Sequence, residues 1–213
     1  MDSLGRHEDY GQEALSESQL LEDPIEQFKD WLIEAEKAEI FEPNAFVLST
    51  IAKGNKPSSR TVLLKGVEDG CFVFFTNFES RKGQAIENNP FVSAVFGWYS
   101  IYRQVLIEGQ VERISDVDSE KYFHSRPHES QVAAWSSRQS QPIQSREKLD
   151  EQFSEALAKF DGEVVPKPEY WGGYRIVPNR IEFWKGRSNR MHDRIAFSRD
   201  ESSDQWEPQR LQP

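Results

Sequence analysis

A segment near the C-terminus, with the sequence GRSNRMHDRIAF, holds residues that could bind an anion in a chain of formal net charge -10. If residues 190–197 form a strand, Arg190, His192 and Arg194 share one face and Asp193 points to the other. Three groups that are or can become cationic repel each other unless an anion lies among them. Taken alone, the segment favours a solvated strand with surface arginines, in which Asp193 pairs with a neighbouring arginine.

A second basic cluster, SRKG at residues 80–83, directly follows the apolar stretch CFVFFTN. Ser80 can cap a following short helix, whose free N–H groups would lie beside Arg81 and Lys82. Such a helix N-terminus is a ready anion site. A polar loop with a capping serine is the alternative.

Arg60 and Lys65 enclose a third apolar stretch in SSRTVLLK. Five residues apart, they would face opposite sides of a regular strand. They therefore either contact different parts of a ligand or lie on either side of a strand end. A pair of surface side chains that extend their charges to solvent is the alternative, and it is favoured for two such residues alone.

Two polar segments follow, KYFHSRPHES and WSSRQS. On a helix, Tyr122 and Arg126 are adjacent, and together with Ser130 they can donate several hydrogen bonds to one phosphate. Gln139 and Ser140 suit a phosphate or a polar heterocycle. An ordinary helix end and a plain loop are the respective alternatives.

Other kinds of site find no support. The four histidines lack metal-ligand spacing, and the chain has no GxGxxG, P-loop or GxSxG motif. The one cysteine, Cys71, cannot form an intrachain disulfide and is expected to be a small buried hydrophobe. Net acidity argues against a nucleic-acid binder. No stretch has the length of a membrane span and no signal sequence is recognisable, so we expect a cytoplasmic protein with no membrane partner.

The elements that must position these residues are mainly strands. Residues 1–22 are polar and are expected to form a mobile N-terminal arm, and a helix then begins after Asp23, with Pro24 in its first turn. Strands are predicted at 45–51, 60–67, 71–77, 91–98 and 103–114, helices between 116 and 160, and further strands to the C-terminus, including one at 190–197. Short turns between successive strands favour an antiparallel closed or split barrel.

Together the clusters form one ordered series of motifs: RTVLLK, FFTN-x-x-SRKG, RQVLIEG, YFHSRP, SQVAAWSSRQS, WGGYRI-x-P-x-RIEFW-x-G and R-x-HDR. The series, over about residues 20–213, closely resembles the pyridoxamine 5′-phosphate oxidase family. The resemblance implies a single FMN-binding domain at 23–213, a mainly β antiparallel split β-barrel with flanking helices, which forms a homodimer with FMN at the subunit interface.

The resemblance also implies residue roles. The positions that match the family's FMN motifs are Arg60, Thr61, Val62, Leu63, Leu64, Lys65, Phe75, Thr76, Arg81, Lys82, Gln104, Gln139, Ser140, Trp184 and Arg194. Those that match its substrate motifs are Lys65, Tyr122, Arg126, Ser130, Arg190, Met191 and His192. Arg190 and His192 would be catalytic, covering and orienting the pyridine ring, and no general base is assigned.

The activity implied is oxidation of pyridoxamine 5′-phosphate and pyridoxine 5′-phosphate to pyridoxal 5′-phosphate, in vitamin B6 biosynthesis and salvage. Hydride passes from substrate C4′ to the flavin, and O2 reoxidises the flavin to give H2O2. Arg6 and Tyr10 correspond to an Arg and a Tyr of the family's N-terminal arm, and Glu42 to an acid before the first strand. A split-barrel flavin reductase of another substrate and a non-catalytic pyridoxal phosphate carrier stay open as alternatives.

Overall fold

Helix α1 (Pro24–Lys37) forms where the sequence predicts and closes one side of the core. The Asp23 side chain accepts the backbone N–H of the second helical residue at 2.8 Å, which satisfies one free donor of the first turn. Phe28 is fully buried, and its ring centroid lies 4.9 Å from that of Phe72 and 4.8 Å from that of Phe96. These contacts fix the helix against the inner face of the sheet.

The computed structural model describes residues 10–200, 203 and 205–213. Within this part of the chain the strands are β1 (Ala45–Ala52), β2 (Lys56–Leu63), β3 (Gly66–Glu68), β4 (Cys71–Asn77), β5 (Phe91–Trp98), β6 (Arg103–Arg113), β7 (Trp171–Lys185), β8 (Asp193–Ser198) and β9 (Glu207–Leu211). The further helices are α2 (Arg81–Asn88), α3 (Asp116–Ser125), α4 (His128–Ser136) and α5 (Arg146–Lys159).

The strands form one antiparallel sheet in the order β2-β1-β5-β6-β7-β4-β3, with β8 paired to β7 and β9 paired to β8. Strand β7 pairs with β6 along most of its length, with β4 over its first half and with β8 over its second half. The sheet therefore divides at β7, and its curvature brings β2 close to β4 without pairing the two strands. This arrangement confirms the expected mainly β, antiparallel split barrel.

A bulge at Asn179 of β7, which has no partner on β6, lets β7 follow the curved sheet. The register between the two strands shifts between Glu108 and Gly109. A Cβ atom on Gly109 would lie 2.1 Å from the backbone oxygen of Val177, so only glycine allows this approach.

Four predicted strands differ from those observed. The stretches GGYRIV and RIEFW, expected as two strands, form the single strand β7, because β6 pairs with it across both stretches from Tyr174 to Lys185. The strand predicted at 60–67 ends at Leu63, and the chain resumes pairing in β3. The strand predicted at 190–197 begins only at Asp193, which changes the geometry of the basic segment that precedes it.

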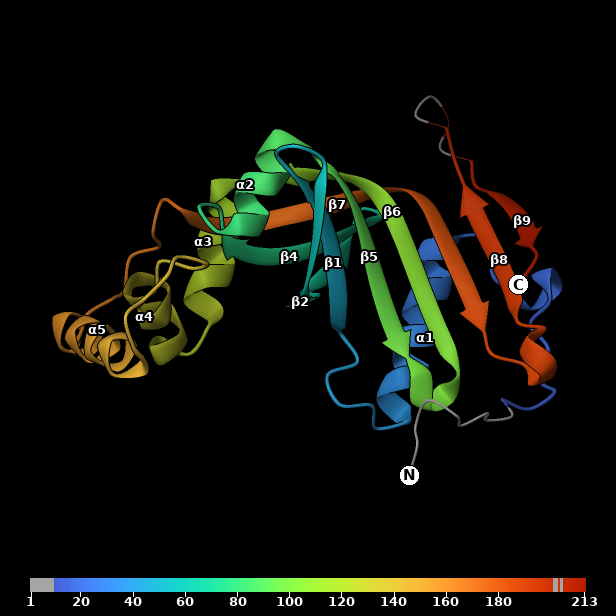
Figure 1. Ribbon diagram of the computed structural model, residues 1–213, viewed down its shortest axis with the longest axis horizontal. Helices are drawn as coiled ribbons and strands as arrows, with labels where there is room; N and C mark the ends of the chain where they lie inside the picture. Colours follow the sequence, from blue (N-terminus) through green and yellow to red (C-terminus); the bar gives the residue numbers. More distant parts are fainter. Residues whose placement is uncertain (1–9, 201–202, 204) are drawn as a thin grey trace.

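The two ends of the molecule carry different elements (Figure 1). Helices α3, α4 and α5 gather at one end around a second apolar core that includes Phe123 and Trp171. Strands β8 and β9 lie at the other end, where the first described residues of the chain pack. There Leu15 is buried and its N–H donates to Asp193 at 2.9 Å. The expected mobility of residues 1–22 stays a prediction, and residues 1–9 lie outside the described part.

No helix in the described part of the chain is both long enough and apolar enough to span a membrane.

Candidate active site

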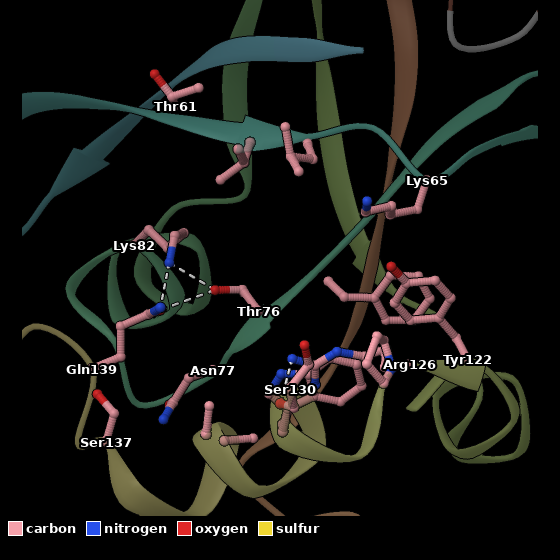
Figure 2. Close-up of a pocket in the computed structure, with 17 residues that line it drawn as sticks. Thr61, Lys65, Thr76, Asn77, Lys82, Tyr122, Arg126, Ser130, Ser137 and Gln139 are labelled. Carbon is pink, nitrogen blue, oxygen red and sulfur yellow. Dashed lines mark hydrogen bonds between the residues drawn. The ribbon is translucent and has the colours of Figure 1, made fainter. Parts of the chain in front are cut away.

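A cavity of about 590 Å³ opens between β2, β4 and the helices α3 and α4 (Figure 2). It lies where β2 and β4 approach without pairing, so the unclosed seam of the barrel forms one wall. Eleven residues predicted from the sequence line it: Thr61, Val62, Leu63, Lys65, Phe75, Thr76, Lys82, Tyr122, Arg126, Ser130 and Gln139. Four separate predicted clusters thus meet in one place.

Lys82 is the buried cation at one side of this cavity. Its Nζ donates to Thr76 Oγ1 at 2.7 Å and to Gln139 Oε1 at 2.6 Å, contacts that Figure 2 draws as dashed lines. Burial, with a smaller contribution from the nearby Arg60 charge, lowers the pKa of Lys82 to about 8. The contacting side chains carry no negative charge, so an anion placed here would supply the missing counter-charge.

The N-terminus of α2 lies beside Lys82, as the SRKG motif predicts. The Ser80 side chain accepts the N–H of Gly83 at 3.2 Å and caps the helix. Arg81 is exposed at the first helical position. A cap, a helix N-terminus and two cations therefore occur together at the end of β4.

Arg60 and Leu64 lie behind the cavity instead of lining it. Arg60 Nη1 donates to the Leu48 carbonyl at 3.0 Å and to Thr50 Oγ1 at 2.8 Å, and burial together with the Arg81 charge lowers its pKa. Leu64 is buried in the main core. Lys65 follows the end of β2, so the Arg60–Lys65 pair lies on either side of a strand end, as one of the two expectations has it.

The opposite side of the cavity presents an arginine with an unused donor. Arg126 Nη2 donates to the Ser130 carbonyl at 2.7 Å, while its Nη1 is buried and has no hydrogen-bond partner among the described residues. Burial lowers the pKa of Arg126 and raises the pKa of the Tyr122 phenol, which therefore stays protonated and can donate. Lys65 adds an exposed ammonium at the same cavity.

The cavity is cationic although the chain is acidic. Lys65, Lys82 and Arg126 line it, and none of the 17 described lining residues is Asp or Glu. Charge of one sign in a concave site attracts the opposite sign from solution. Three cations from separate basic clusters are therefore gathered at one site, while the cations of the C-terminal segment lie elsewhere.

Sequence reasoning missed six lining residues: Asn77, Pro127, Ala133, Ala134, Ser137 and Trp171. All of them but Trp171 stand within a few positions of predicted residues in the same motifs, so proximity in sequence could have found these five. Trp171 comes from β7, and its ring stacks with Tyr122 (6.2 Å, 3°) and Phe75 (5.5 Å, 13°). Only the pairing of β4 with β7 places it there.

A second cavity of about 1020 Å³ adjoins the first and shares Asn77, Ser137 and Gln139 with it. Ser140, predicted as a cofactor residue, lines this second cavity.

The remaining predicted residues lie at the other end of the barrel. Gln104 pairs with Trp184 and Trp184 with Arg194, so the three form a row across β6, β7 and β8 on one face of the sheet. Arg194 donates to the buried Glu182 at 2.7 Å. None of this row lines the described cavities.

Arg190, Met191 and His192 form a turn before β8, which corrects the expectation that Arg190, His192 and Arg194 share a strand face. Residues Ser188–Arg190 make a 3-10 turn, and Arg190 has φ 60°, so the alternation of a strand does not apply. Arg190 and Met191 are exposed. The physical reason is that Asp193 is the first residue of this segment that pairs with β7, opposite Lys185.

His192 is held in a defined orientation beside that row. Its Nδ1 accepts the Arg187 backbone N–H at 3.0 Å, so the neutral ring carries its proton on Nε2. Its ring centroid lies 4.8 Å from Trp184 and 5.6 Å from Tyr10. Burial and the Arg190 charge lower the pKa of His192.

Asp193 confirms the expectation of a neighbouring arginine partner. It is buried, and Arg210 Nη1 donates to it at 2.7 Å, with Arg187 at 3.6 Å. Tyr10 packs on Trp184 and His192, while Arg6 lies outside the described residues and the role of Glu42 stays a prediction.

Comparison with known proteins agrees with this geometry. Residues 32–159 match a family model described as pyridoxamine 5′-phosphate oxidase, and residues 171–213 match the pyridoxine 5′-phosphate oxidase C-terminal dimerisation region. The chain belongs to the pyridoxamine 5′-phosphate oxidase family. The family resemblance and the enzyme class expected from the sequence are thereby confirmed.

Curated relatives match this family member over its whole length. A pyridoxine/pyridoxamine 5′-phosphate oxidase of Rubrobacter xylanophilus is 47% identical over 212 residues, covering 100% of this chain and 97% of the relative. The protein of that name from Thermosynechococcus vestitus is 48% identical over 205 residues, covering 96% of each chain.

Solved structures share the fold. PhzG from Burkholderia lata 383, in complex with tetrahydrophenazine-1-carboxylic acid, has a TM-score of 0.86 at 30% identity, covering 94% of this chain and 98% of its own. A pyridoxamine 5′-phosphate oxidase-related, FMN-binding protein from Nostoc punctiforme has a TM-score of 0.74 at 14% identity, covering 90% of this chain and 98% of its own. The second likeness supports the fold of this family member.

Proposed function

We propose that this family member oxidises pyridoxamine 5′-phosphate and pyridoxine 5′-phosphate to pyridoxal 5′-phosphate, with FMN as its cofactor. The observation that carries the proposal is that one cavity holds two separate anion-binding groups. Lys82, with Thr76, lies on one side, and Arg126, with an unused buried donor, lies on the other. A phosphorylated cofactor and a phosphorylated substrate together need two such groups.

The residues around Lys82 fit the phosphate of FMN. A buried ammonium of lowered pKa without an acidic partner is stabilised by a bound dianion. The Thr76 hydroxyl and the N-terminus of α2 supply further donors. Once an anion replaces Gln139 Oε1 as the hydrogen-bond partner of Lys82, the Gln139 amide can rotate and donate to the ligand.

The residues around Arg126 fit the phosphate of the substrate. Its free Nη1, the protonated Tyr122 phenol, the Ser130 hydroxyl and Lys65 can all donate to one phosphate group. A non-phosphorylated substrate would leave the buried donor unpaired, and this cost favours the phosphate esters.

When bound, FMN would supply the hydride acceptor for substrate C4′, with O2 taking up the electrons as H2O2; with the amine substrate, water then hydrolyses the imine and ammonia leaves. The chain supplies position and charge. Its grip on the substrate phosphate holds the ring in place and removes much of the entropic cost of alignment. His192 donates a hydrogen bond from Nε2, and Arg190 adds a positive charge over the ring. No residue is required as a general base.

The catalytic site is completed by a second copy of the chain. Trp171, which lines the cavity, and Trp184, in the predicted FMN row, stand thirteen residues apart on β7. At about 3.3 Å per residue they are separated by about 40 Å, more than one FMN molecule spans. Trp184 therefore contacts a flavin held by another copy. The matched dimerisation region, residues 171–213, includes Trp184 and Arg194 of this row.

An anaerobic titration tests the activity. The protein is reconstituted with FMN, pyridoxamine 5′-phosphate is added without O2, and the visible absorbance of the flavin is followed. Bleaching that recovers in air supports the oxidase. Flavin that stays oxidised in the presence of substrate contradicts it and leaves a flavoprotein of another substrate. A protein that binds pyridoxal phosphate but no flavin would be a carrier.

Mixing two inactive variants tests the shared site. Lys82→Met and Trp184→Ala each damage one half of every site in a homodimer. A mixed dimer has one site with both changes and one intact site, so random reassociation restores about a quarter of wild-type activity. Mixtures as inactive as the separate variants would contradict the shared site.

A further inference from the structure

Trp171 contacts the guanidinium that grips the substrate phosphate. The Cζ atom of Arg126 lies 4.8 Å from the Trp171 ring centroid and 5.5 Å from that of Phe123. Trp171 is 7% exposed, so this contact is largely shielded from water. A cation over a tryptophan face is attracted by the ring quadrupole, most strongly where solvent is excluded.

The orientation of Arg126 depends on few groups. Among the residues that the structure describes, no carboxylate forms an ion pair with it, and its hydrogen bond to the Ser130 carbonyl fixes only Nη2. The Trp171 face contacts the guanidinium at Cζ, while Nη1 of this cavity-lining arginine keeps no hydrogen-bond partner among the described residues. An arginine held by these two contacts retains a donor of its planar fork for a phosphate.

Trp171 is itself fixed by other elements. Its ring is nearly parallel to those of Phe75 and Tyr122, which stack on each other at 3.8 Å. Its backbone pairs with Asn77 at the end of β4. The aromatic stack therefore connects β4, α3 and β7. It fixes Arg126 and the Tyr122 phenol relative to the sheet.

We propose that Trp171 is a positioning residue for the substrate phosphate, which acts by holding the Arg126 guanidinium in the plane that presents Nη1 to the ligand. This inference rests on the proposed function and adds to it a residue that selects phosphorylated over non-phosphorylated substrates. Trp171 contacts the Arg126 guanidinium and not the reacting carbon, so the rate of the chemical step depends little on Trp171.

The test compares substrates with and without the phosphate. Trp171→Leu is expected to raise KM for pyridoxamine 5′-phosphate about ten- to thirty-fold, with kcat changed less than about three-fold. The value of kcat/KM for pyridoxamine, which lacks the phosphate, stays unchanged. Trp171→Phe, which keeps an aromatic face, loses about three-fold or less. Equal losses for the two substrates would mean a structural role and would overturn the proposal.

A double-mutant cycle asks whether Trp171 acts through Arg126. In an Arg126→Lys background, Trp171→Leu is expected to add little further loss, because a lysine does not present a planar fork. Fully additive losses would overturn the proposal. Trp206→Leu is the matched control, since Trp206 makes a similar contact of 4.6 Å with Arg199 outside the site. It should leave the ratio between the two substrates unchanged.

A binding measurement separates this inference from the proposed activity. Pyridoxal 5′-phosphate and pyridoxal are titrated into the FMN-loaded protein, and the change in flavin absorbance reports binding without turnover. Trp171→Leu should weaken only the phosphorylated ligand. If wild-type protein binds the phosphorylated ligand more tightly but does not oxidise the substrate, the proposed activity is wrong and the proposed role of Arg126 in phosphate binding is retained. If Trp171→Leu binds both ligands like wild type, the grip role fails.

Discussion

The pH dependence of FMN binding tests the anion site around Lys82. In the ligand-free protein, burial lowers the pKa of Lys82 to about 8, so the ammonium loses its proton as the pH rises through this value. A phosphate dianion against the ammonium raises that pKa in the complex. Binding therefore takes up a proton at alkaline pH, and affinity falls as the pH rises above about 8.

The size of the effect follows from the fraction of protonated Lys82. At about pH 7 about nine in ten molecules carry the proton, and at about pH 9 about one in eleven do. FMN affinity should therefore fall about ten-fold between these values, or about 1.4 kcal/mol. The phosphate ester, with a second pKa near about 6, is a dianion throughout and contributes no change of its own.

Titration of flavin fluorescence against apoprotein measures the effect. Lys82→Met should bind FMN weakly and without this pH dependence. Arg81→Met removes an exposed cation from the same helix terminus, so it weakens binding but retains the alkaline loss. Riboflavin, which lacks the phosphate, should bind with a flat profile. The same alkaline loss in Lys82→Met, or with riboflavin, would refute the assignment of the phosphate to Lys82.

Three further predictions concern stability and are measured by urea denaturation. Glu182→Gln should cost about 2 kcal/mol at neutral pH, because it removes the buried carboxylate partner of the half-exposed Arg194. Burial acts to raise the Glu182 pKa, but its arginine hydrogen bonds outweigh burial and lower it, so this stabilisation is present above the unfolded pKa and is lost as pH falls through the folded value. Phe28→Ala should cost about 4 kcal/mol by opening a cavity in the main core. Gly109→Ala should cost about 2 kcal/mol or more, because its Cβ would lie 2.1 Å from the Val177 carbonyl oxygen.

Exposed positions provide controls for these variants. Glu112→Gln breaks an ion pair with Arg175 at the surface and should cost less than about 1 kcal/mol. Phe41→Ala alters a ring that is 88% exposed and should be nearly neutral. A Glu182→Gln or Phe28→Ala variant as stable as its control would contradict the packing argument. A stable Gly109→Ala variant would contradict the argument about the bulge.

Local signals in the sequence determined much of the fold. Asp23 and Pro24 define the start of α1, and Ser80 defines that of α2, because caps and fixed backbone angles act within a few residues. Stretches rich in Val, Ile, Phe and Thr between turn signals identified the central strands, because these preferences also act locally. The family motifs identified eleven residues of the cavity, although their individual roles stay predictions.

Tertiary structure decided what depends on partners distant in the sequence. Strand β7 is continuous because β6 pairs with most of it, and Trp171 reaches the cavity because β4 pairs with its first residues. Arg190 lies in a turn because β8 can pair with β7 only from Asp193 onward.

The sequence also could not show that the predicted FMN residues are divided between two ends of the barrel. Motif order lists Lys82 and Trp184 as parts of one site, whereas the length of β7 keeps the two ends of the sheet apart. The sequence by itself determined which cationic residue types are available to the proposed phosphate sites and where local elements such as α1 and α2 begin. Strand pairing, which joins residues far apart in the chain and separates others on one strand, decided which of them meet within a single copy.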